Sequence, residues 1–228
     1  MSFAGILART QMVDNKVRLA KPELLDTLQA NDPRAMRSRS DLRIINFLMG
    51  NESWIINRLK KEHKFTNKRI VEIGAGDGDL CRKIHQQFPE ANIRAYDLLE
   101  RPAQLPEKVE WCSGDVTQCS PPQGYGALIA NLFIHHFDDS KLAWLSAWLP
   151  HFSLVIINEP LRRKAPHLLG ALMHPFINDV TRHDMHVSID AGFRRGEIMQ
   201  LLGISSQQWS CEEIEHWKGA CRTILCKR

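Results

Sequence analysis

The chain has 228 residues with 43% hydrophobic and 25% charged side chains, which suits one soluble α/β domain with a modest extension. No apolar run approaches the roughly 20 residues of a membrane helix, and residues 1–14 do not resemble a signal peptide, so we expect a cytoplasmic protein without a membrane span. The net charge is only +4, whereas a dedicated nucleic-acid-binding protein usually carries a more concentrated basic patch.

Residues 1–64 are predicted to form a helical N-terminal extension that serves as a lid. Pro22 opens a short helical pattern, because proline is tolerated in the first turn of a helix. Apolar residues at helical spacing follow over 42–59, with a break near Gly50. A cluster of arginines in this extension either faces solvent or offers a landing site for an anionic substrate: Arg34, Arg37, Arg39 and Arg43.

Short apolar runs alternate with helical patterns over residues 65–228, which indicates a mostly parallel sheet covered on both faces. The last two apolar runs flank a turn and are predicted to form an antiparallel pair. The long connection 160–190 is interpreted either as a lid-like insertion or as a helix packed on the sheet. The predicted strands are 69–73, 93–97, 109–112, 127–133, 154–158, 209–217 and 220–226, and the predicted helices are 79–88, 140–149 and 194–202.

A glycine-rich turn that follows the first predicted strand and opens a helix is the strongest signal in the sequence. Glycines at positions 74, 76 and 78 let the backbone turn tightly and approach a ligand without a Cβ in the way. Asp97 ends the next strand about 20 residues later, where a carboxylate can accept both hydroxyls of a ribose. Asp115 follows the third strand, where it either accepts a hydrogen bond from an adenine amino group or caps a turn.

The spacing and charge of this turn favour S-adenosylmethionine (SAM) over NAD. A dinucleotide turn has the spacing G-x-G-x-x-G, whereas this turn has G-x-G-x-G. Asp77 and Asp79 would repel a pyrophosphate at a helix N-terminus but suit the sulfonium and amino group of SAM, and Glu72 adds to that negative field. An NAD dehydrogenase is therefore disfavoured.

Residues 71–80 resemble motif I of the class I SAM-dependent methyltransferases, and Asp97, Asp115 and residues 130–133 resemble the later motifs in the same order. The resemblance covers residues 69–158 and implies a Rossmann-like, seven-stranded sheet with an antiparallel last strand. It implies that the turn contacts the methionine part of SAM, Asp97 the ribose and Asp115 the adenine. The cofactor-binding residues expected are Glu72, Gly74, Ala75, Gly76, Gly78, Asp97, Leu98, Asp115, Val116 and Asn131.

The residues after the fourth predicted strand bear on the methyl acceptor. Methyltransferases that act on the amino group of adenine or glutamine carry an (Asn/Asp)-Pro-Pro-(Tyr/Phe) motif at the end of this strand. This chain departs from that motif and has Asn131 followed by Leu-Phe-Ile-His-His-Phe. The latter pattern resembles small-molecule O- and C-methyltransferases, which implies a small acceptor. The aliphatic and Met side chains of segment 160–190 suggest that this acceptor is hydrophobic or aromatic. Two alternatives stay open: an RNA methyltransferase, which predicts salt-sensitive RNA binding, and a SAM-binding protein without turnover.

A base with a pKa near neutrality would assist proton removal from a phenol or enol, and histidine is the natural candidate. His136, which follows His135, and His183 in the segment 160–190 are the catalytic candidates, or else are held as structural side chains. His183 and Asp184 are not expected to form an oriented pair, because adjacent side chains usually point apart. The six cysteines include no CxxC pair and no zinc-finger spacing, so no metal site is expected.

Overall fold

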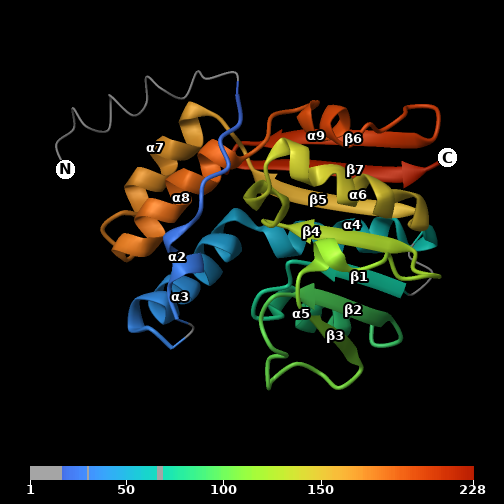
Figure 1. Cartoon of the computed structure of the whole chain (residues 1–228), viewed down its shortest axis with the longest axis horizontal. Coiled ribbons are helices and arrows are strands. Elements are labelled where there is room, and N and C mark those ends of the chain that lie inside the picture. The colour runs from blue at the N-terminus through green and yellow to red at the C-terminus, as the bar shows by residue number, and fades with distance from the viewer. Residues whose placement is uncertain (1–16, 30, 66–68) are drawn as a thin grey trace.

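A seven-stranded sheet in the order β3-β2-β1-β4-β5-β7-β6 forms the centre of the computed structural model, which describes residues 17–29, 31–65 and 69–228 (Figure 1). Strands β1 to β5 are parallel, β7 is antiparallel to β5, and β6 is antiparallel to β7. The Rossmann-like sheet with an antiparallel last strand is thereby confirmed. The strands are β1 (Arg69–Ile73), β2 (Asn92–Asp97), β3 (Val109–Ser113), β4 (Ala127–Asn131), β5 (Leu154–Pro160), β6 (Trp209–His216) and β7 (Ala220–Lys227).

Helices cover both faces of this sheet and enclose two hydrophobic cores. Every residue of β5 is buried, as expected for a central strand whose side chains face helices on both sides. One core packs α4 (Asn51–Lys61) and α5 (Asp79–Gln87) against the strands. The other core packs α6 (Ala143–Trp148) and α9 (Glu197–Leu201) against the opposite face.

The described residues that precede β1 include the helices α2 (Leu24–Thr27), α3 (Pro33–Met49) and α4. Gly50 separates α3 from α4 because it adopts φ +69°, a left-handed conformation that ends a helix. In α4, Ile55 and Leu59 are fully buried in the same core as β1 and β2, so α4 is part of the sheet's covering layer.

The long connection 160–190 folds into α7 (Lys164–Met173) and α8 (Asp179–Ala191). These two helices lie beside α2 and α3 at one end of the sheet (Figure 1). The N-terminus of α8 is fixed to α3, because the side chain of Asp41 accepts a hydrogen bond of 2.8 Å from the Asn178 amide.

Short 3-10 helices connect several of the strands and helices. The predicted helix 140–149 begins as one of them and becomes α-helical at Ala143. Within the described residues, no helix combines the length and the apolar character needed to cross a membrane. Residues 1–14, which do not resemble a signal peptide in sequence, lie outside the described residues. The 3-10 helices are η1 (His63–Phe65), η2 (Val116–Gln118), η3 (Ile134–His136), η4 (Asp139–Leu142) and η5 (Leu149–His151).

Candidate functional site

The glycine-rich turn lies between β1 and α5 and is folded by left-handed backbone conformations. Gly74, Gly76 and Gly78 have φ values of +69°, +54° and +71°, which L side chains rarely adopt. A Cβ built on Gly74 would lie 2.2 Å from the ring of Phe133, whereas a Cβ on Gly76 would meet nothing within 4 Å. The turn is therefore packed against the loop after β4 on one side and open at Gly76, as a cradle for a ligand requires.

Asp97 at the end of β2 faces this turn. One of its carboxylate oxygens accepts a hydrogen bond of 2.7 Å from the Gly76 amide, and the other accepts one of 2.9 Å from the Leu99 amide. A carboxylate offers about four acceptor positions, so both oxygens keep the capacity to accept from a ribose. Leu98, beside it, is exposed at the same strand end.

The other expected cofactor residues lie at neighbouring strand ends of the same sheet edge. Asp115 follows β3 and caps η2, accepting hydrogen bonds of 2.9 Å from the Thr117 amide and 2.7 Å from its hydroxyl. Val116 is buried in the core. Asn131 ends β4, and its side-chain oxygen accepts a hydrogen bond of 2.8 Å from Asn158. Asp115 is exposed and remains accessible, but its local contacts are those of a turn cap.

The negative field expected at the turn is largely compensated within the chain. Asp77 forms an ion pair of 3.0 Å with Arg43, and Asp79 forms one with Arg82. Burial raises the pKa of Glu72 to about 8, even though the Cys81 thiol donates a hydrogen bond of 2.7 Å to it. Glu72 is therefore mostly neutral at pH 7, and the preference for SAM over NAD rests on the fold and the glycine spacing. A hollow of about 510 Å³ opens here, lined by Arg43, Asp77, Asp79, Arg82, Pro102, Ala103 and Gln104.

The arginine cluster of the N-terminal helices is also engaged within the chain. Arg34 pairs with Asp32 at 3.1 Å and Arg37 pairs with Asp41 at 3.0 Å, in addition to the pair between Arg43 and the turn. These contacts favour the interpretation of the cluster as a solvated helix surface that also holds the helices in place.

The loop after β4 is fixed by a buried carboxylate at the end of β5. Glu159 accepts hydrogen bonds of 3.0 Å from the amides of both Phe133 and Ile134, and one of 3.3 Å from the amide of His135. Its other interaction is with the imidazole of His135, whose Nδ1 lies 2.7 Å from a carboxylate oxygen. The loop begins at Leu132, whose φ of +54° ends the strand earlier than the sequence predicts.

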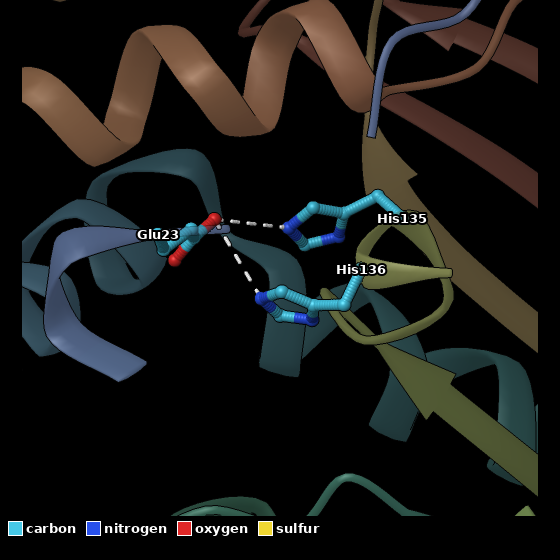
Figure 2. A group of neighbouring side chains, drawn as sticks. All are labelled: Glu23, His135 and His136. Carbon is cyan, nitrogen blue, oxygen red and sulfur yellow. Dashed lines mark ion pairs between the residues drawn. The ribbon is translucent and has the colours of Figure 1, made fainter. Parts of the chain in front are cut away.

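A second carboxylate, Glu23, faces both histidines of this loop (Figure 2). One oxygen of Glu23 lies 3.5 Å from Nε2 of His135 and 3.6 Å from Nε2 of His136. Burial opposes the charged form of His135, but Glu159 and Glu23 outweigh it and raise its pKa to about 9. Burial likewise opposes the charged form of Glu23, but the two histidines hold its pKa well below the ordinary value.

The catalytic candidates His136 and His183 occupy different surroundings. His136 remains partly exposed at the loop, with its Nδ1 3.0 Å from the Phe133 carbonyl oxygen. His183 lies on α8 with its Nδ1 2.8 Å from Asp184, so the expectation that these neighbours point apart is wrong. Asp184 is held in place because it also accepts hydrogen bonds from backbone amides of α2. Among the described residues, no hydrogen bond or ion pair joins His183 to His136.

The site includes residues that the sequence analysis missed, above all Glu23 and Arg18 of the N-terminal strap, which we define as residues 17–29. The side chain of Arg18 is buried, forms an ion pair of 2.8 Å with Asp139, and donates to carbonyl oxygens of η3 and α8, 2.9 Å away in the case of Ala191. No local pattern marks these residues. Glu159 directly follows the predicted strand 154–158 and lies at the carboxyl end of β5, on the sheet edge that carries Asp97, and that position could have identified it.

Comparisons with curated proteins agree with this geometry. No family model matches the chain. The chain is 24% identical over 139 residues to trans-aconitate 2-methyltransferase of Mycobacterium ulcerans (strain Agy99), covering 58% of this chain and 50% of that protein. It is 26% identical over 148 residues to malonyl-[acyl-carrier protein] O-methyltransferase of Acinetobacter baylyi, covering 64% and 47%. The chain thus spans about half the length of the curated relatives it matches.

Solved structures match nearly the whole chain. The plantazolicin methyltransferase BpumL, in complex with S-adenosylhomocysteine (SAH), superposes with a TM-score of 0.69 at 14% identity, covering 98% of this chain and 99% of that chain. The SAM-dependent methyltransferase SibL superposes with a TM-score of 0.64 at 13% identity, covering 98% and 68%. The chain therefore has the fold of the class I SAM-dependent methyltransferases, and its sequence is similar to that of proteins named as methyltransferases.

Proposed function

We propose that the chain transfers the methyl group of SAM to an oxygen or carbon atom of a small, hydrophobic or aromatic acceptor. The observation that carries this proposal is the packing of Phe133 on Gly74, which brings the loop with the two histidines directly against the glycine-rich turn. Ligands bind beyond the carboxyl ends of strands in open α/β sheets, and both loops lie there. A donor at the turn and an acceptor at the histidines would therefore be neighbours.

Different residues bind the methyl donor and assist the methyl acceptor. Asp97 accepts hydrogen bonds from the ribose, and Gly76 leaves room for the ligand beside it. SAM, when bound, supplies a methyl group that its sulfonium already activates, so the protein mainly has to align donor and acceptor. The Phe133 carbonyl fixes the proton of His136 on Nδ1, so the lone pair of Nε2, which lies 3.6 Å from a Glu23 oxygen, can receive the acceptor's proton. Such assistance typically contributes about 10²–10⁴ in rate.

A thermal-shift titration with SAM, SAH and NAD tests the donor site. We expect SAM and SAH to stabilise the wild type by roughly 2.7 kcal/mol at about 100 times their dissociation constants, and NAD to have no effect. Asp97→Ala should lose this response, whereas Glu107→Ala, a change at an exposed carboxylate, should keep it. A folded wild type that SAM leaves unmoved would contradict the proposal.

The acceptor class requires a second assay. SAH release is measured with phenols, enols and carboxylic acids in turn, and with RNA as the alternative acceptor. Turnover on a small molecule supports the proposal. Turnover on RNA alone, with binding that weakens steeply as salt increases, would support the alternative. Binding of SAM without turnover on any acceptor class would indicate a non-catalytic protein.

A further inference from the structure

Three metal-ligating atoms converge where the N-terminal strap meets the loop after β4. They are a carboxylate oxygen of Glu23 and the Nε2 atoms of His135 and His136, and all three lie within 4.8 Å of one another (Figure 2). More than 100 residues of sequence separate Glu23 from the histidines. Only the folded chain brings them together, which is why the spacing of the cysteines and histidines gave no sign of a metal site.

The ion pairs within this group are longer than a direct charge-assisted hydrogen bond. Charge-assisted hydrogen bonds between nitrogen and a carboxylate are about 2.7–2.9 Å long, and the pair between His135 and Glu159 has such a length at 2.7 Å. The Glu23 oxygen instead lies 3.5 Å and 3.6 Å from the two Nε2 atoms. Ligands of a tetrahedral zinc ion, each about 2.0–2.2 Å from the metal, lie roughly 3.3–3.6 Å apart.

Both imidazoles are also oriented as metal-binding histidines are. Nδ1 of His135 donates to the carboxylate of Glu159, and Nδ1 of His136 donates to the carbonyl oxygen of Phe133 at 3.0 Å. Hydrogen bonds of this kind fix the ring orientation and leave the lone pair of Nε2 for a metal. Glu159 is itself held by three backbone amides, so the support of His135 is rigid.

We propose that Glu23, His135 and His136 form a binding site for a divalent metal ion of the zinc type. Two imidazoles and one carboxylate suit zinc and neighbouring transition metals, whereas magnesium and calcium favour oxygen ligands throughout. Ser188 donates a hydrogen bond to the same Glu23 oxygen and orients the carboxylate toward the histidines.

The site is closed on one side and open on the other. The side chains of His135 and Glu23 are 4% and 10% exposed, while that of His136 is 33% exposed. Three protein ligands with one open position are typical of catalytic rather than structural zinc sites. A bound metal would polarise an oxygen of the acceptor and ease its deprotonation, and it would replace proton removal by His136, because Nε2 of His136 would then be a ligand. This role rests on the proposed methyl transfer, whereas binding of the ion does not.

A second histidine cluster supplies a matched control. On α7 and α8, His186 lies between His167 and His174, with nitrogen–nitrogen distances of 2.8 Å and 3.1 Å. Both ring nitrogens of His186 face a neighbouring imidazole, so three ligand atoms do not converge on one point there. Removing His186 should therefore leave metal binding unchanged.

Calorimetric titration of Zn²⁺ into chelator-treated full-length protein tests the proposal, with neither SAM nor acceptor present. We expect one equivalent to bind. Glu23→Gln and His136→Asn should weaken binding by more than the roughly 10–100-fold that loss of a supporting hydrogen-bond partner costs. His186→Asn should bind as the wild type does. Absence of a tight equivalent in the wild type, or a loss confined to His186→Asn, would overturn the proposal.

If a variant fails to fold, the visible spectrum of the Co²⁺-substituted wild type still tests the proposed ligands, because it requires no substitution. Tetrahedral Co²⁺ with nitrogen and oxygen ligands gives ligand-field bands without a thiolate-to-metal charge-transfer band. A strong thiolate band would place the metal on one of the six cysteines and overturn the proposal. Failure of the SAM titration described above would refute the methyltransferase function alone, because the metal titration requires no SAM.

Discussion

The carboxylate of Glu159 and the imidazole of His135 lie 2.7 Å apart, and both side chains are almost completely buried. The same carboxylate accepts hydrogen bonds from three consecutive backbone amides of the loop after β4. One side chain at the end of β5 thus determines the position of the loop that carries His135 and His136.

Glu159→Ala should lower the free energy of unfolding by about 3–5 kcal/mol, because it leaves several amides buried without a partner and leaves the imidazole of His135 with only the more distant carboxylate of Glu23. Urea denaturation measures this loss. Glu107→Ala is the control, since Glu107 is exposed and its loss should change stability by no more than about 0.5 kcal/mol. A loss below about 1 kcal/mol for Glu159→Ala would show that the loop keeps its position without the carboxylate.

Gly74→Ala and Gly76→Ala should differ in cost although both glycines have positive φ. Each alanine is strained by about 1–2 kcal/mol in a left-handed conformation. At position 74 the new Cβ also collides with the ring of Phe133, which adds about 1–3 kcal/mol. The double variant Gly74→Ala with Phe133→Ala should recover part of this added cost relative to the sum of the single changes. Denaturation curves of the wild type, the three single variants and the double variant decide this, and equal losses at positions 74 and 76 would refute the collision.

Glu72 should make the protein less stable as pH rises. Its pKa is about 8 in the folded chain and near 4.5 when unfolded, so the folded state binds more protons between these values. Stability should therefore fall from about pH 4.5 to pH 8, by at most about 1.4 kcal/mol per pH unit from this group. Glu72→Gln removes the titration, so its free energy of unfolding should fall less steeply over that window. Parallel curves for the variant and the wild type would contradict the prediction.

Arg43→Ala should have little effect on stability, because its ion pair with Asp77 is about half exposed on the arginine side. Such surface pairs contribute about 0–1 kcal/mol. Combining it with Arg34→Ala and Arg37→Ala tests the RNA alternative. We expect the dependence of any RNA binding on salt to be unchanged, since these arginines pair within the chain. A fall in the salt slope by about 1 for each arginine removed would instead mark phosphate contacts.

Sheet topology could be predicted because central strands are continuous apolar runs. The predicted strand 69–73 coincides with β1, and the predicted closing pair agrees with β6 and β7 within about a residue. The predicted strand 127–133 ends earlier, at Asn131, because Leu132 turns into a left-handed conformation that its residue type does not signal. The helices of segment 160–190 were less evident, since their apolar residues lie partly on an exposed face.

The donor side of the site could be predicted because it depends on local chemistry: glycines at a strand end and Asp97 at the next one. The acceptor side could not. Glu23 reaches the two histidines only through tertiary packing, and no spacing rule connects positions so far apart. The pairing of His183 with Asp184 was mispredicted because amides of α2 fix Asp184 in place, and His183 can reach it there.

The N-terminal strap is fastened to the domain mainly by polar contacts. Arg18 binds backbone carbonyl oxygens, Glu23 faces the two histidines, and the amides of Leu24 and Leu25 bind Asp184, while Leu24 itself is 41% exposed. Releasing the strap would break these ion pairs and hydrogen bonds but leave both hydrophobic cores intact. Opening of the acceptor side is thereby uncoupled from unfolding, and its rate should respond to ionic strength rather than to the stability of the sheet.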